Sequence, residues 1–263
     1  MRLKHFKTKK IIWFFFSGVF LFFGPAISLI NQNLSGNLVN AQSKNIVKNS
    51  IKDNQTSIQV YAARTWGLKG ALAVHTWITT KRNNANHFIN YQIIGWRYRY
   101  GNRSPLVMTQ SMHPIQNWYG NPATLLVNLN GNQYESIIDK IENAITQYPY
   151  RNTYTLWPGP NSNTFTAYIA REVPELTLDL PSTAIGKDYR PLSNAIGISP
   201  SGSGIQANIF GLLGFTIALE EGFELNLLSL NFELDLFDAA FELPGLGRFG
   251  KNQIPQVVFT ENH

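Results

Sequence analysis

The chain has 263 residues, of which 44% are hydrophobic and 13% aromatic, and it contains no cysteine. This composition is typical of a folded domain of about 200 residues and excludes a largely disordered chain. The lack of cysteine excludes disulfides, a thiolate nucleophile and Cys-ligated zinc or iron–sulfur sites.

The net charge of +6 comes mainly from the N-terminal segment. Five basic side chains lie within residues 1–10, and the rest of the chain carries 17 basic and 16 acidic residues. We therefore predict no nucleic-acid partner. Residues 44–151 carry 12 basic and 4 acidic groups, whereas residues 152–263 carry 5 and 12. We interpret this as two solvated faces that attract each other; the alternative is an anionic partner of the first half, such as a lipid head group.

Residues 1–30 are predicted to be a membrane anchor or a signal segment. Residues 11–30 are uncharged and strongly apolar, and twenty helical residues span about 30 Å, the thickness of a bilayer core. The basic flank predicts an N-terminus in the cytoplasm and a body outside it. A cleaved signal is the alternative, because Gly24-Pro25 would end a shorter apolar region and small residues follow near Ala41.

The polar residues 31–57 are expected to form a linker. A folded domain is predicted over residues 58–200, followed by a β-rich extension over residues 201–250 and a tail over residues 251–263. Three strands are predicted in the domain. Residues 58–63 alternate apolar and polar side chains, and the runs at 71–80 and 87–99 form a hairpin around a polar turn.

Two helices follow in the same domain. Residues 134–148 place Ile137, Ile141 and Ile145 on one face, with the charged residues outside this stripe. A shorter helix is predicted over residues 164–172, with Ser162 and Asn163 suited to cap its start. These elements predict an α+β fold with an antiparallel sheet and helices.

The extension has an alternating pattern of its own. Over residues 223–236, apolar side chains alternate with Glu224, Glu233 and Asp235. This predicts one or two hairpins whose acidic face is exposed to solvent. The alternative is a flap that lies against a membrane, and the spaced acids argue against it because they are costly in hydrocarbon.

Two polar side chains are candidates for chemistry, namely His75 in the apolar strand and Ser162 at the helix start. Each also has a plain structural explanation. A histidine beside Trp77 can make all its hydrogen bonds within the core. Ser162, Asn161 and Asn163 are ordinary cap and turn residues.

The five tryptophans after the N-terminal segment suit either core packing or a groove for a glycan, a peptide or an acyl chain; they are Trp66, Trp77, Trp96, Trp118 and Trp157. The sequence contains no phosphate-cradling loop, dinucleotide fingerprint or metal motif. We therefore predict no cofactor and no metal ligand.

Residues 58–250 resemble the DUF3750 family, a group of uncharacterised bacterial proteins. The matching segments lie at residues 60–67, 74–78, 94–97, 157–165, 169–176, 180–189 and 210–214. The resemblance implies no activity. Together with the N-terminal segment it implies a single-pass protein of a bacterial inner membrane, whose body lies in the periplasm or otherwise outside the cytoplasm.

A remote similarity covers residues 71–185. A strand histidine that precedes an Asn-Ser pair at a helix start is similar to the order in circularly permuted papain-like hydrolases of the PPPDE, LRAT and NlpC-P60-like groups, which have cysteine where Ser162 stands. The similarity implies a permuted papain-like core in which His75 is the general base and Ser162 holds the nucleophile position. It also implies that Tyr91 or Gln92 orients the histidine.

The similarity further implies a cleft whose binding residues are Asn161, Asn163, Trp77, Trp157, Tyr91 and Gln92. We expect a membrane-anchored protein of the cell envelope with a Ser/His hydrolase or acyltransferase-like site for an amide or ester. Because the thiol is missing, the alternative is a catalytically inactive papain-like scaffold that binds an envelope ligand or partner. A third is a structural envelope protein that assembles through residues 201–250. The expected partners are the membrane, through the N-terminal helix, and an unknown envelope ligand.

Overall fold

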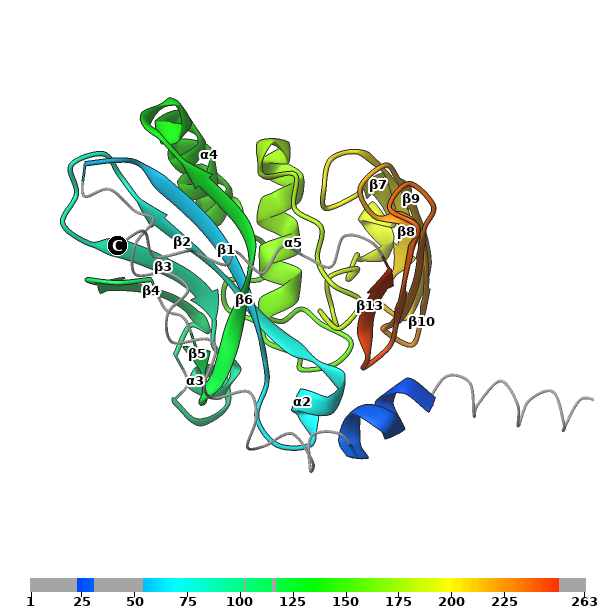
Figure 1. Cartoon of the computed structure of the whole chain (residues 1–263). Coiled ribbons are helices and arrows are strands. Elements are labelled where there is room, and N and C mark those ends of the chain that lie inside the picture. The colour runs from blue at the N-terminus through cyan, green and yellow to red at the C-terminus, as the bar shows by residue number, and fades with distance from the viewer. Residues whose placement is uncertain (1–22, 31–53, 102, 115–116, 251–263) are drawn as a thin grey trace, which may run out of the picture.

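Two antiparallel sheets with helices between them and around them make up the fold (Figure 1). The computed structural model describes residues 23–30, 54–101, 103–114 and 117–250. It confirms the predicted α+β class. The first sheet has the strand order β4-β3-β2-β1-β6-β5. Its strands are β1 (Ser57–Arg64), β2 (Val74–Lys81), β3 (Phe88–Ile93), β4 (Leu106–Ser111), β5 (Asn117–Trp118) and β6 (Asn121–Asn130).

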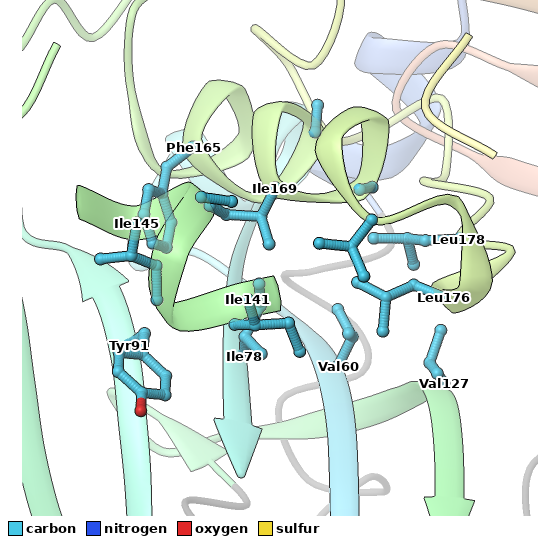
Figure 2. Close-up of a cluster of buried hydrophobic side chains, with 14 of the residues drawn as sticks. Val60, Ile78, Tyr91, Val127, Ile141, Ile145, Phe165, Ile169, Leu176 and Leu178 are labelled. Atoms are coloured by element: carbon cyan, nitrogen blue, oxygen red, sulfur yellow. The ribbon is translucent and has the colours of Figure 1, made fainter. Parts of the chain in front are cut away.

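The main core lies between the first sheet and two helices, α4 (Glu135–Gln147) and α5 (Ser162–Glu172). A 3-10 turn, η2 (Asn132–Tyr134), precedes α4, so the helix predicted over residues 134–148 is confirmed. Figure 2 shows Val60 and Ile78 of the sheet facing Ile141 and Ile169 of the helices, and all four are fully buried. The burial of each of these side chains contributes about 1.5–3 kcal/mol to the stability of the fold.

Two predicted strands are wrong in part. The stretch at 71–80 begins with a short helix, α2 (Lys69–Leu72), and the stretch at 87–99 ends in α3 (Gly95–Gly101). Aromatic and basic residues alternate over residues 96–100 with the period of a strand, yet no residue of α3 is buried. The chain turns at Gly95, where a side chain would overlap the ring of Tyr154, and glycine permits this close approach.

The second sheet is formed by residues 196–250 and has the order β13-β12-β11-β10-β9-β8-β7. Its inner face packs on the segment after α5, which includes η3 (Pro174–Leu176) and η4 (Leu192–Asn194). Its strands are β7 (Ile196–Ile198), β8 (Gly204–Ile209), β9 (Leu213–Ala218), β10 (Gly222–Leu227), β11 (Leu230–Asp235), β12 (Ala240–Leu243) and β13 (Gly247–Gly250).

The acidic face of this sheet, predicted to be wet, is buried. Glu224, Glu233 and Asp235 are 2%, 3% and 2% exposed, whereas Phe223 and Leu234 are each 48% exposed. The hairpin of β10 and β11 is present, as predicted, but the prediction of which face meets water is wrong.

Paired charges explain this reversal. Glu224 forms an ion pair with Lys187, and Arg248 lies 3.0 Å from Glu233 and 2.6 Å from Asp235. A carboxylate that has a cationic partner and hydrogen bonds can be buried, whereas an isolated one cannot. These acids therefore pair within their own half of the chain, on a buried face, instead of forming the solvated face that we predicted.

Residues 23–30 are helical and lie beside the turn between β12 and β13, where a side chain at Gly24 would overlap the Pro244 carbonyl oxygen (Figure 1). Most of the predicted anchor, most of the linker and the predicted tail lie outside the described residues. In the part of the chain that the structure describes, no helix is both long and apolar enough to cross a bilayer.

Candidate functional site

The start of α5 is held by a reciprocal cap. The side-chain oxygen of Asn161 accepts hydrogen bonds from the backbone N–H groups of Asn163 at 2.9 Å and Thr164 at 3.2 Å. The hydroxyl of Thr164 accepts one in return from the Asn161 N–H at 3.0 Å. The cap residue is thus Asn161, and Ser162, which we expected to cap the helix, is its first helical residue.

The two asparagine amides are committed to the fold. Nδ2 of Asn161 donates to the carbonyls of Leu156 and Ile185, at 3.1 and 3.0 Å. Nδ2 of Asn163 donates to Val74 at 3.0 Å and to Ile185 at 2.8 Å. These bonds join the helix start to β2 and to the loop at residue 185, so both amides act as structural clamps.

Ser162 is buried at 7% exposure. Its carbonyl accepts a hydrogen bond from the Thr166 hydroxyl at 3.3 Å, as the first turn of a helix allows. Among the described residues, its own hydroxyl has no hydrogen-bond partner within the protein. The hydroxyl is therefore free for a ligand or for water.

His75 is held from two sides on β2. Its Nε2 lies 3.0 Å from Oε1 of Gln92, and its ring stacks on Trp118 with centroids 3.8 Å apart. Burial lowers the pKa of His75 to about 4, and the hydrogen bond with Gln92 opposes this shift. The imidazole is consequently neutral at pH 7. Because Oε1 accepts, Nε2 carries the proton and Nδ1 is the free acceptor.

His75 points away from α5. Alternate residues of a strand face opposite sides of the sheet, and Thr76 contacts α5 through a 3.0 Å hydrogen bond to Asn163 Oδ1. His75 and Trp77 therefore lie on the other face, where Trp77 packs with Tyr61. Within the described residues, no hydrogen bond joins His75 to Ser162.

The two residues proposed to orient the histidine also face opposite ways. Gln92 contacts His75. Tyr91 lies in the core between the sheet and the helices, and its hydroxyl donates to Glu142 at 3.0 Å (Figure 2). Burial raises the pKa of this hydroxyl.

A cavity of about 600 Å³ opens at the end of the first sheet, where β2 begins and β3 ends. His75, Ser162, Asn161, Asn163 and Trp157 all line it. Trp77, Tyr91 and Gln92 do not lie in its wall: Trp77 is fully buried, and Gln92 reaches the site only through His75.

Aromatic rings and two cations dominate the rest of the wall. Trp66, Trp96 and Trp157 are 58%, 53% and 52% exposed, and the charged residues of the wall are Lys69 and Arg99, with no carboxylate. The two cations were not singled out by the sequence analysis. The aromatic–basic alternation at 96–100 was a signal for Arg99 alone, and we predicted that stretch to be a strand.

The model of the DUF3750 family, described as proteins of unknown function, matches residues 55–189, which is half of the chain. The chain belongs to the DUF3750 family. In this DUF3750 protein the matched region contains the first sheet, α4, α5 and every residue of the cavity wall, whereas the strands of the second sheet lie beyond it. A search of curated proteins and a search of solved structures found no match. The described residues hold no group of three or more His, Asp or Glu side chains suited to a metal ion.

Proposed function

We propose that this DUF3750 protein is anchored in the membrane of the cell envelope and that its aromatic cavity binds an anionic envelope ligand. The wall of the cavity carries the proposal. Half-exposed rings such as Trp66 and Trp157 offer flat apolar faces for a sugar ring or an acyl chain. Two cations without a carboxylate favour an anion, as does the excess of basic groups in the first half of the chain.

Each cation lies beside an aromatic ring. Nζ of Lys69 is 5.1 Å from the centroid of the Trp66 ring, and the guanidinium of Arg99 is 5.5 Å from that of Tyr100. A ligand in which an anionic group adjoins a ring or an apolar chain satisfies both chemistries at one place. Anionic lipids and acidic glycans of the envelope have this arrangement.

We infer that the first sheet, α4 and α5 form a permuted papain-like core that serves as a binding scaffold. Support comes from the helix that begins with Asn161-Ser162 and packs on an antiparallel sheet, and from the His75–Gln92 bond. Acyl transfer requires the nucleophile and the base within reach of each other. Because His75 points away from α5, ligand binding fits this geometry better than catalysis.

A Ser/His hydrolase or acyltransferase is the second candidate. It is favoured by the free hydroxyl of Ser162 and the free Nδ1 of His75, which line one cavity. In this reaction the hydroxyl oxygen attacks the carbonyl carbon of an amide or ester while the imidazole takes the hydroxyl proton and passes it to the leaving amine or alcohol. Water or another acceptor then releases the acyl group.

The binding proposal is tested with the full chain held in amphipol. Tryptophan fluorescence is followed while monomeric dihexanoyl phosphatidylglycerol, which is anionic, or its zwitterionic phosphatidylcholine counterpart is added. We expect tighter binding of the anionic probe. Replacing Lys69 and Arg99 together by Gln should weaken it about tenfold or more. Lys140→Gln, an exposed cation on α4, is the matched control. Equal affinity for both probes, or no effect of the double variant, would contradict the proposal.

The second candidate is tested by labelling the same protein with a fluorophosphonate. Ser162→Ala and His75→Ala are compared with Ser193→Ala, an exposed serine that is not part of the cavity wall. A label that both cavity substitutions abolish and the control retains would establish an activated serine. A folded protein that takes no label supports the binding scaffold.

A further inference from the structure

The outer face of the second sheet is the face turned away from α5 (Figure 1). Its side chains are apolar across the whole sheet. One row of cross-strand neighbours crosses every strand, and its members are 40–58% exposed. The row consists of Ile198, Ile205, Ile217, Phe223, Leu234, Phe241 and Phe249. With strands about 4.8 Å apart, the outer face measures roughly 30 Å by 15–20 Å. An apolar patch of this size on a protein surface usually marks an interaction site.

The inner face fixes this orientation. Its main row is polar and buried, and Asp188 accepts hydrogen bonds there from Gln206 at 2.6 Å and from Asn226 at 3.0 Å. The ion pairs of Lys187 and Arg248 lie on the same side. The sheet cannot turn its apolar face inward without leaving buried charges unpaired, so the outer face stays available for a partner.

The tips of the turns are apolar as well. Leu219, Leu228, Leu236 and Phe237 are 64%, 52%, 77% and 76% exposed. Turns usually carry polar residues, and an interface between proteins usually has a polar, hydrated rim. Here four turn tips are apolar and at least half exposed, beside only the exposed Glu220 and the half-exposed Asp238, which pairs with Arg248. This favours contact with hydrocarbon over contact with a second copy of the chain.

The N-terminal apolar segment reaches one edge of this sheet. Residues 11–30 are uncharged and apolar. Within them, the helical residues 23–30 lie against the turn between β12 and β13, where Gly245 packs on Pro25 and accepts a hydrogen bond from Arg64 at 2.9 Å. If the apolar segment enters a bilayer, this edge of the sheet is held at the bilayer surface.

We propose that the outer face of the second sheet lies on the bilayer, with its apolar side chains among the lipid acyl chains. The inference rests on the proposed membrane anchoring and extends the contact from one N-terminal segment to a whole sheet. The acids of β10 and β11 do not oppose it, because Glu224, Glu233 and Asp235 all face inward. The exposed Glu220 lies in the turn between β9 and β10, at the rim of the face. This orientation removes the objection that spaced acids raise against a membrane-facing sheet.

The test uses spin labels on single cysteines, which the absence of native cysteine makes specific. The full chain is reconstituted in vesicles of phosphatidylethanolamine and phosphatidylglycerol. Labels are placed on the outer face by Ile217→Cys and by the milder Ala207→Cys. Ser136→Cys on α4, which is exposed and nearly isosteric, is the control. Relaxation by oxygen, which concentrates in hydrocarbon, is compared with relaxation by a water-soluble nickel chelate.

We expect the ratio of oxygen to nickel accessibility to be several-fold higher on the outer face than at the control. High nickel accessibility at both outer positions would overturn the proposal, because the face would then be in water. Low accessibility to both reagents would overturn it too, since another protein surface would then cover the face. Flotation of the same vesicles separates membrane anchoring from contact of the sheet with the bilayer. A chain that floats but fails the accessibility test is anchored without using the sheet. A chain that does not float refutes both proposals.

Discussion

His75 and Gln92 face each other on neighbouring strands, with Nε2 of the histidine 3.0 Å from Oε1 of the glutamine. The bond fixes the tautomer, and the stack on Trp118 fixes the plane of the ring. The histidine is thus a rigid, neutral part of the cavity wall. Its buried neutral state links the stability of the fold to pH.

Stability should fall as pH drops from about 6.5 to about 4. In this window the unfolded chain binds a proton at His75 and the folded chain does not, because burial lowers the folded pKa to about 4. The loss should approach about 3 kcal/mol at the lower end. Urea denaturation at stepped pH measures it. His75→Gln is the control, and an unchanged pH dependence in that variant would assign the loss to other groups.

Gln92→Glu should raise the pKa of His75 well above 4, because a carboxylate opposite Nε2 favours the imidazolium. Titration of the histidine ring signals by NMR reports this directly. Gln92→Leu removes the hydrogen bond that raises the pKa and should therefore not shift it upward. An upward shift in both variants would point to loosened packing instead.

Asn161→Ala should destabilise the protein by about 3 kcal/mol. It removes the cap of α5, worth about 1 kcal/mol, and leaves the carbonyls of Leu156 and Ile185 without this donor. Urea denaturation measures the change. Asn143→Ala, an exposed asparagine on α4, should change stability by less than about 0.5 kcal/mol. Similar losses in both variants would refute the clamp.

Lys187→Met should cost about 3–5 kcal/mol, because it leaves the buried carboxylate of Glu224 without its cation. The double variant with Glu224→Met should recover much of this loss, since two apolar side chains can replace a buried ion pair. Denaturation of the wild type, both single variants and the double variant completes the cycle. Additive losses would mean that the pair is not coupled.

Leu225 and Asn226 are neighbours on β10. We expect Asn226→Ala to destabilise the protein more than Leu225→Ala, which is the reverse of the order in an ordinary apolar core. Asn226 is 4% exposed and bonds to Asp188, Asn231 and Ser229, so its loss should cost about 2–3 kcal/mol. Leu225 is 37% exposed, so its truncation should cost less than about 1 kcal/mol in lipid-free solution. A larger loss at Leu225 would show that its face is covered by protein.

The sequence by itself determined the elements whose signals are local. The stripe containing Ile137, Ile141 and Ile145 predicted α4, and the alternation in residues 58–63 predicted β1, because a helix and a strand each impose their own period. The cap signal of Ser162 and Asn163 predicted the start of α5 at residue 164, and the helix begins two residues earlier, at Ser162. The aromatic–basic run at 96–100 was misleading, because its period of two is that of a strand although the run lies on an exposed helix whose residues line the cavity.

Only the tertiary structure decided which way the alternating strands face. Alternation shows that the two faces of a strand differ, but it does not show which face is buried. The acidic face is the buried one because Glu224 pairs with Lys187 and Asp235 pairs with Arg248, and both cations come from other segments of the chain. In the same way, a strand histidine before a helix serine did not reveal that His75 turns away from α5. Burial depends on partners brought together by the fold, and a local pattern does not contain them.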